Sequence, residues 1–152
     1  MEVSIQPISR RNRKQVLGLS LAEEQKGFVE SPAECLREAR RIRLWRPVAI
    51  CASDQVVGFA MYGKFPQKGE RGRVWLDRLL IDRQHQGKGY GRTAISALCR
   101  RLNRQYHCDA IYLSCYPANT TAMTLYQNMG FQCNGEKDIN GEDVMVLKWD
   151  ET

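Results

Sequence analysis

The sequence has 152 residues, a length typical of one domain, and its 43% hydrophobic and 26% charged residues are ordinary for a folded globular protein. This composition argues against intrinsic disorder, and no apolar run approaches the roughly 18 residues that a membrane span needs. The first residues lack the basic and then apolar layout of a signal peptide. We therefore expect a single domain over residues 1–152, cytoplasmic and without a membrane partner.

Hydrophobic periodicity and turn residues predict eleven elements in the order βααβββαβαββ. In chain order they are a strand at 3–8, helices at 11–21 and 31–43, strands at 48–52, 56–62 and 73–81, a helix from a glycine-rich turn to about 106, a strand at 110–116, a helix at 118–129, and strands at 131–135 and 143–149.

Local signals mark several of these boundaries. Ser31, Pro32 and Glu34 form the pattern of a capped helix start, and Gly130 is typical of a helix end. Asn140-Gly141 is a tight-turn dipeptide between the last two strands. The strand at 73–81, its following helix and the strand at 110–116 are expected to form a right-handed parallel crossover.

Six cysteines are spread along the chain without a C-x-x-C pair, and there are only two histidines. Most of these cysteines stand among apolar neighbours, as Cys51 and Cys99 do. The spacing argues against a metal site and favours free thiols in a reducing compartment.

The net charge of +6 is concentrated in residues 71–104, where nine basic residues accompany two acidic ones, a surplus of +7. The other residues carry fourteen basic and fifteen acidic groups, a balance of −1. Such a segment is typical of a site for an anionic partner: a nucleic acid, a membrane surface or a phosphorylated small molecule. The solvated face of a helix at Arg100, Arg101 and Arg104 explains part of the surplus.

A glycine-rich turn, from Gln86 to Arg92, joins the strand at 73–81 to the next helix. Backbone amides at a helix N-terminus favour phosphate, and Lys88 and Arg92 add positive charge. The spacing matches neither the G-x-G-x-x-G of a dinucleotide site nor a Walker A loop. A tight turn without a ligand explains the glycines, but not the basic charge around them.

Two motifs in this order resemble those of the GNAT N-acetyltransferase superfamily. Gln86 to Gly91 matches Q/R-x-x-G-x-G/A, and the segment from Asn119 to Phe131 matches N-x-x-A-x-x-L-Y-x-x-x-G-F. Residues 57–63, 72–78 and 131–136 resemble, more narrowly, the bacterial spermine/spermidine (diamine) acetyltransferases of the Blt type. The resemblance covers nearly the whole chain.

The resemblance implies the GNAT fold, an α/β structure. Its mixed, mostly antiparallel sheet would have six to seven strands, a central parallel pair and about four helices. It also implies acetyl-CoA as co-substrate, with a β-bulge that splays the strand at 73–81 from its neighbour to admit the pantetheine arm. The residues implied for the coenzyme are Leu79, Leu80 and Ile81 along the arm, Gln86, Gly87, Lys88, Gly89, Tyr90, Gly91 and Arg92 at the diphosphate, and Asn119 and Tyr126.

Direct acetyl transfer to an amine would need a proton acceptor and a proton donor. The resemblance implies Tyr126 as general acid toward the leaving thiolate, although a core aromatic at helical spacing is the structural alternative. Asp77 is the candidate base, through a bridging water; it is equally a candidate to bind the substrate cation, or to pair with Arg73 or Arg78. The Leu80 amide is the expected oxyanion donor. Cys115 with a histidine, and Ser114, lack the setting of a nucleophile.

A polyamine acceptor is a cation, whereas the chain is net positive. Acidic residues in the N-terminal helical region, with Phe28 and Glu30 as the best candidates, are expected to bind it, unless they form only a solvated surface. A protein amine or an aminoglycoside is the alternative acceptor. A non-catalytic module that binds nucleic acid is a remote alternative, because no reader motif is present. A homodimer is compatible with the sequence, but no residue requires one.

Overall fold

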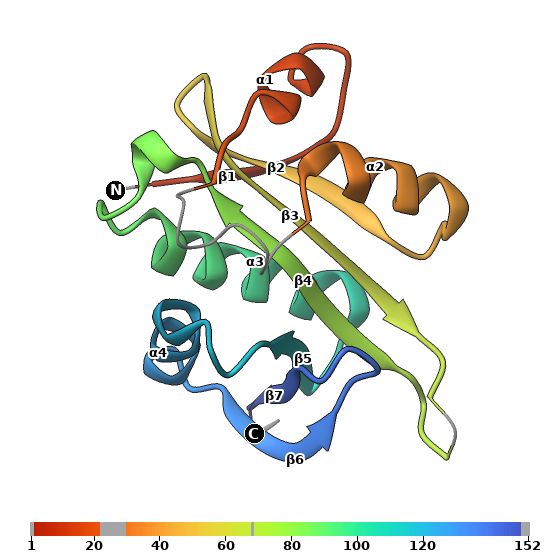
Figure 1. The fold of residues 1–152 in the computed structure, drawn as a ribbon. Helices are drawn as coiled ribbons and strands as arrows, with labels where there is room; N and C mark the ends of the chain where they lie inside the picture. The colour runs from red at the N-terminus through yellow and green to blue at the C-terminus, as the bar shows by residue number, and fades with distance from the viewer. Residues whose placement is uncertain (1, 22–29, 68, 150–152) are drawn as a thin grey trace.

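The computed structural model describes residues 2–21, 30–67 and 69–149, which form a seven-stranded sheet with helices on both faces (Figure 1). The strand order is β1-β2-β3-β4-β5-β7-β6, and only β4 and β5 are parallel among the paired strands. The strands are β1 (Ser4–Pro7), β2 (Arg46–Ala52), β3 (Gln55–Phe65), β4 (Arg73–Ile81), β5 (Ala110–Cys115), β6 (Gln132–Lys137) and β7 (Asp143–Lys148).

Four α-helices accompany the sheet in the described residues, and their order along the chain confirms the predicted βααβββαβαββ arrangement. They are α1 (Arg13–Leu17), α2 (Pro32–Arg41), α3 (Tyr90–Tyr106) and α4 (Thr120–Asn128). Figure 1 shows α1 and α2 on one side of the sheet and α3 and α4 on the other. None of the helices in the described ranges is long and apolar enough to cross a membrane.

Alternation along the strands divides the buried side chains between two cores, one on each face of the sheet. Ile50 and Tyr62 pack on the face covered by α3, with Ile95 and Leu98 of that helix. Ala49, Phe59 and Met61 pack on the other face, with Val16 of α1 and Leu36 of α2. The sheet is therefore the middle layer of three.

A β-bulge interrupts this alternation in β4. Two residues of β4, Arg78 and Leu79, oppose the single residue Ala60 of β3, and Arg78 adopts a left-handed φ of 55°. As a result Leu76 packs toward α3 whereas Leu80 packs into the opposite core, although a regular strand would place both on one face. The predicted bulge is thus present in the predicted strand.

Beyond the bulge, β4 parts from its parallel neighbour. The only register pair between β4 and β5 in the described residues is Trp75 with Tyr112, near the start of β4. The C-terminal half of β4 is therefore not paired with any described strand on that side, which leaves the V-shaped opening that the resemblance implied.

Two predicted elements end three or more residues away from the observed boundary. The helix expected at 11–21 is confined to the five residues of α1, because Gly18 caps it and the chain then turns away. The strand expected to end at Tyr62 continues to Phe65, since its register with β4 extends to the pair of Phe65 with Arg73. All six cysteines are free, as predicted.

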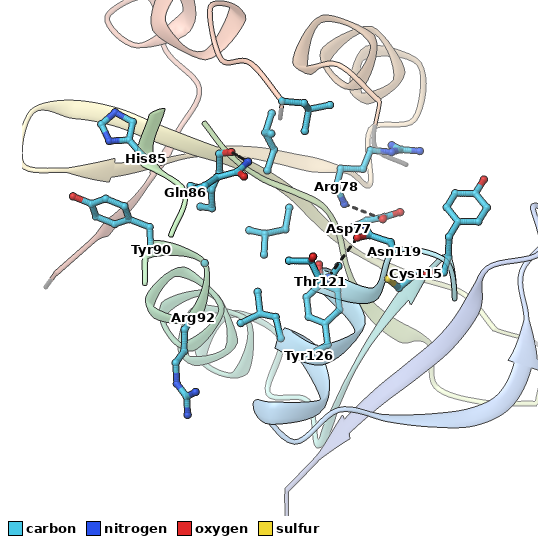
Figure 2. Close-up of a pocket in the computed structure, with 18 of the residues that line it drawn as sticks. Asp77, Arg78, His85, Gln86, Tyr90, Arg92, Cys115, Asn119, Thr121 and Tyr126 are labelled. Carbon is cyan, nitrogen blue, oxygen red and sulfur yellow. Dashed lines mark hydrogen bonds between the residues drawn. The ribbon is translucent and has the colours of Figure 1, made fainter. Parts of the chain in front are cut away.

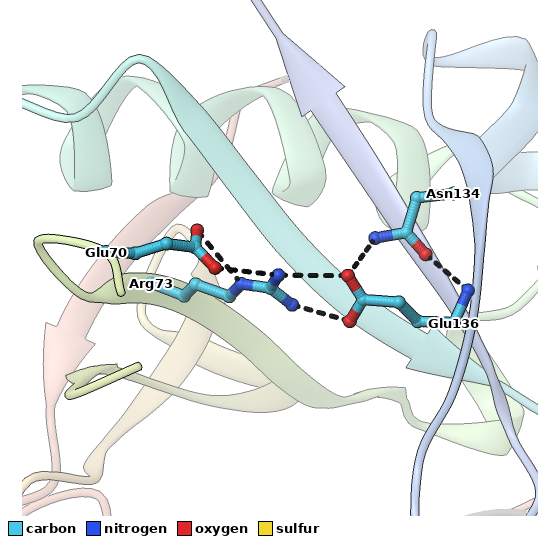
Figure 3. Close-up of polar contacts among 4 residues, drawn as sticks. All are labelled: Glu70, Arg73, Asn134 and Glu136. Atoms are coloured by element: carbon cyan, nitrogen blue, oxygen red, sulfur yellow. Dashed lines mark hydrogen bonds and ion pairs between the residues drawn. The ribbon is translucent and has the colours of Figure 1, made fainter. Parts of the chain in front are cut away.

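A buried arginine connects β4 to the far edge of the sheet (Figure 3). Arg73, only 8% exposed, forms ion pairs with Glu70 at 3.0 Å and Glu136 at 2.7 Å. Its guanidinium carbon lies 4.4 Å from the centre of the Tyr112 ring. Asn134 in turn donates to Glu136 at 3.1 Å. These contacts fix the hairpin of β6 and β7 relative to β4.

Candidate functional site

The opening between β4 and β5 contains a cavity of about 330 Å³ (Figure 2). Its walls are the C-terminal half of β4, the glycine turn, the first turn of α3, the end of β5 and α4. Figure 2 places His85, Gln86 and Tyr90 toward one end and Asp77 and Cys115 toward the other. The lining includes Asp77, Leu79, Leu80, Ile81, Gln86, Gly87, Gly89, Tyr90, Gly91, Arg92, Asn119 and Tyr126 among the predicted site residues.

The glycine turn is held open by backbone geometry and by one side chain. Gly87 and Gly89 have φ values of 77° and 88°, in the left-handed region that only glycine enters without strain. The amide of Gln86 donates from Nε2 to the Ile81 carbonyl at 2.9 Å, which ties the turn to the end of β4. Gly89 begins α3 without a side-chain cap, so the first amides of the helix are free to bind an anion.

Gly91, the third glycine of the turn, allows α3 and α4 to pack closely. A β-carbon at Gly91 would lie 3.3 Å from Leu125 Cδ2, so α3 and α4 approach each other closely there. This contact brings the two helices together at the cavity floor.

Only some of the basic and aromatic residues of the glycine turn line the cavity. Arg92 is exposed and lines the cavity, whereas Lys88 is exposed and lies outside the lining. His85 also lines it and contacts the Tyr90 ring edge to face, with ring centres 5.9 Å apart. The predicted anionic site at this end therefore combines helix amides with Arg92.

Tyr126 reaches the cavity from α4. Its ring packs edge to face on Phe131, with centres 5.9 Å apart, and Phe131 N–H donates to the Tyr126 carbonyl. Burial, with smaller contributions from Cys115 and Asp77, raises the pKa of Tyr126 well above its ordinary value. The phenol therefore keeps its proton at neutral pH and can donate it. The ring is at once part of the core and part of the cavity wall.

Asn119 caps α4, because its Oδ1 accepts the Ala122 N–H at 3.4 Å. This bond, drawn in Figure 2, orients the helix that carries Tyr126.

Asp77 lies at the bulge and also lines the cavity. Its Oδ1 accepts the backbone N–H of Arg78 at 2.9 Å. Burial raises the pKa of Asp77 to about 6, against the opposing effect of the Arg78 charge and N–H. The alternative of a salt bridge to Arg73 or Arg78 is not realised, because both guanidinium groups pair with glutamates instead.

The Arg78 side chain turns away from Asp77 toward α2. Its Nε donates to Glu30 at 3.0 Å, and its Nη1 lies 2.6 Å from Glu38 without hydrogen-bond alignment. The guanidinium also lies 5.8 Å from the centre of the Trp45 ring. Glu30 therefore borders a neighbouring groove on α2 rather than the main cavity. Phe28, predicted with it, lies outside the described residues.

Several residues that complete the cavity at the Asp77 end were not predicted to belong to the site. Ser114, Cys115 and Tyr116 come from the end of β5, and Glu142 comes from the turn between β6 and β7. They meet because β5 and β7 are antiparallel neighbours, with Cys115 opposite Asp143. Burial raises the pKa of Cys115 to about 12, so this thiol is not a reactive nucleophile.

The two ends of the cavity favour different chemistry. Free helix amides and Arg92 suit an anion at one end, and an unpaired strand edge follows. At the other end a protonated phenol and a half-buried carboxyl with a raised pKa line the same cavity. Such a pair can donate one proton and accept another during a group transfer.

Comparison with known proteins agrees with this geometry. Residues 16–131 match the model of the acetyltransferase (GNAT) family. A spermine/spermidine N(1)-acetyltransferase of Bacillus subtilis strain 168 is 44% identical over 149 residues, which are 96% of this chain and 98% of that protein.

Solved structures share the fold at lower identity. AAC(6′)-Ib in complex with paromomycin and acetyl-CoA superposes with a TM-score of 0.79 at 17% identity, covering 97% of this chain and 94% of that chain. An acetyltransferase from Thermus thermophilus superposes with a TM-score of 0.73 at 20% identity, covering 98% of each chain.

Proposed function

The chain belongs to the acetyltransferase (GNAT) family, and on that premise we propose that it transfers the acetyl group of acetyl-CoA to a primary amine of spermine or spermidine. The whole chain acts as one catalytic domain in this proposal. The single observation that carries it is the continuous cavity from the glycine turn to Asp77 and Tyr126. The spermine/spermidine acetyltransferase relative supplies the acceptor class.

The residues at the first end suit a coenzyme A molecule. The amides of Gly87 to Gly91 and the Arg92 side chain would bind the diphosphate at the N-terminus of α3. The backbone groups of Leu79 and Ile81, which face the open edge of β4, would pair with the amides of the pantetheine arm, as an added strand does. When bound, acetyl-CoA supplies an activated acetyl thioester.

Asp77 would take the proton that the amine must lose. An alkyl ammonium with a pKa near 10.4 leaves roughly one molecule in a few thousand neutral at pH 7, so unassisted attack is slow. Asp77, with its pKa raised to about 6, is ionised at neutral pH yet more basic than an ordinary aspartate. The aspartate side chain is short, so a bridging water between its carboxylate and the amine is part of the proposal.

Tyr126 would give its phenolic proton to the departing thiolate. The amine nitrogen forms the new bond to the acetyl carbon, the C–S bond breaks, and the sulfur takes the proton of Tyr126. The Leu80 N–H, predicted as the oxyanion donor, is not available for this role: Leu80 pairs with Phe59 in the register that joins the Asp82 N–H to the Val57 carbonyl, so its N–H is directed at β3. The proton on Asp77 then returns the phenol to its starting state through solvent.

A panel of acceptors tests the substrate class. Release of free thiol from acetyl-CoA should be faster with spermine and spermidine than with lysine peptides or an aminoglycoside. Equal or reversed rates would overturn the polyamine assignment. Acetyl-CoA should also raise the melting temperature, because it binds only the folded chain. No shift at saturating ligand would contradict the glycine-turn site.

A further inference from the structure

We propose that Glu142 is the residue that selects diamine and polyamine acceptors, because its carboxylate binds a second ammonium group while the first amine reacts beside Asp77. This inference rests on the proposed function and adds to it a residue for acceptor specificity. It starts from the cavity lining, in which Glu142 is the acidic side chain other than Asp77.

The β6–β7 turn holds Glu142 in a fixed place. The Asp138 carboxylate accepts N–H groups from Asn140 and Glu142, each at 2.9 Å. The Asp138 N–H donates to the Glu142 carbonyl at 3.0 Å, and Lys137 pairs with Asp143 beside the turn. A side chain on such a braced turn can bind a ligand without a large loss of conformational entropy.

Glu142 lacks a basic partner among the described residues. The nearby glutamates differ, since Glu30 and Glu38 are both paired with Arg78. Burial, a hydrogen bond with Asp138 and the acidic charges of Asp138, Asp77 and Glu30 raise the pKa of Glu142 to about 8. A partly buried carboxyl among carboxylates and without a cation is a site where a bound ammonium group relieves repulsion.

The position of Glu142 suits a linear acceptor. Glu142 follows Gly141 and precedes Asp143, which is opposite Cys115 in the sheet, so it lies at the end of the cavity away from the glycine turn. Figure 2 places Asp77 toward this same end, and Tyr126 lines the cavity together with both carboxyl groups. A primary amine that reaches Asp77 from the open side would therefore carry its remaining chain past Tyr116 to Glu142.

Equilibrium binding to the protein saturated with coenzyme A tests this without turnover. Spermidine binding would be measured by calorimetry at about pH 8.5, where a carboxyl with a pKa of about 8 is mostly ionised and an alkyl ammonium still keeps its proton. We expect Glu142→Gln to weaken spermidine binding roughly tenfold to a hundredfold, as for loss of one charge-assisted hydrogen bond. Glu142→Asp should recover part of the affinity.

Two controls separate this role from a structural one. Asp54→Asn removes one negative charge on the exposed turn between β2 and β3 and should leave spermidine affinity unchanged. Affinity for coenzyme A should be the same in wild type and Glu142→Gln, which shows that the variant is folded.

Equal spermidine affinity in wild type and Glu142→Gln would overturn the inference, as would a wild-type complex that binds no spermidine. The proposed function is tested by a different measurement, the release of free thiol with the panel of acceptors. If the wild type acetylates polyamines rapidly but Glu142→Gln binds spermidine as tightly as the wild type, the inference about Glu142 is overturned and the proposed function is kept. Weakened binding by Glu142→Gln without thiol release from any amine would support the inference and remove the proposed reaction.

Discussion

Arg73 and Glu136 form a two-pronged ion pair, with Nη1 and Nη2 of the guanidinium 2.7 and 2.9 Å from the two carboxylate oxygens. The pair joins β4 to β6 across the two strands that lie between them in the sheet, and Tyr112 of β5 lies against the guanidinium. Because β4 carries Asp77 and the β6–β7 hairpin carries Glu142, this contact joins the two elements that bear the carboxyl groups of the cavity.

Removal of the ion pair should destabilise the fold. Glu136→Gln leaves the buried Arg73 with Glu70 as its remaining partner, and we expect the free energy of unfolding at pH 7 to fall by about 1–2 kcal/mol. The estimate is below that of a fully buried pair because the Glu136 side chain is 45% exposed and solvent screens it. Urea denaturation measures the change, and Glu2→Gln near the N-terminus is a matched control.

The same pair predicts a pH dependence with a definite sign. The hydrogen bond from Arg73 lowers the pKa of Glu136 in the folded chain. The ion pair therefore stabilises the folded state fully above the unfolded pKa of about 4.3. This stabilisation is lost as the pH falls through the lower pKa of the folded state. The difference in unfolding free energy between wild type and Glu136→Gln should therefore shrink below about pH 4. A difference that stays constant down to pH 3 would contradict the assignment.

Tyr126→Phe should separate chemistry from binding. The ring still packs on Phe131, so acetyl-CoA affinity should change less than about threefold, whereas kcat should fall by about a hundredfold or more, as for loss of a general acid. Steady-state kinetics and calorimetry measure the two quantities. Tyr106→Phe, at the far end of α3, is the control and should keep wild-type kcat. An unchanged kcat in Tyr126→Phe would remove the phenol from the mechanism.

Asp77→Asn should change the pH profile as well as the rate. In the wild type kcat at saturating acceptor should rise with pH until Asp77 ionises near pH 6, because only the carboxylate accepts a proton. The variant should lose this acid limb and about a hundredfold in kcat. Glu142→Gln keeps Asp77 and should retain the limb near pH 6. Persistence of that limb in Asp77→Asn would assign it to another group.

Substitutions in the glycine turn should distinguish backbone conformation from packing. Gly87 has a φ of 77° and open space around it, so Gly87→Ala meets only the strain of the left-handed region, about 1–2 kcal/mol. If the turn relaxes to avoid that strain, its amides move and acetyl-CoA affinity should fall about tenfold. Calorimetry measures this, and Lys88→Ala, outside the cavity lining, should cost less than Gly87→Ala. Equal affinity in wild type and Gly87→Ala would show that the amides there bind no ligand.

Features that depend on neighbouring residues in the sequence were predicted well. The capping box at the start of α2 is present, with Ser31 Oγ accepting the Glu34 N–H at 3.2 Å. The glycine turn and the strand before it also have the predicted limits. Each of these signals is local, since it joins residues within one turn or one strand.

Side-chain contacts that depend on which residues face each other across the strands were not predicted. Glu142 and Cys115 reach the cavity only because β7 pairs with β5, and no motif surrounds either residue. The Arg73–Glu136 pair joins residues 63 positions apart. Glu30 was predicted to bind the acceptor, but it lies outside the lining of the main cavity, and its ion pair with Arg78 could not be deduced from the acidic composition of that segment.

The bulge at Arg78 has a consequence for how the protein avoids unwanted association. Free strand edges invite pairing with other chains and so promote aggregation. Here the free edge faces inward, enclosed by α3, α4 and the end of β5. One inserted residue thus creates an edge that a narrow, extended small molecule can reach while the flanking elements keep the strand of another protein out.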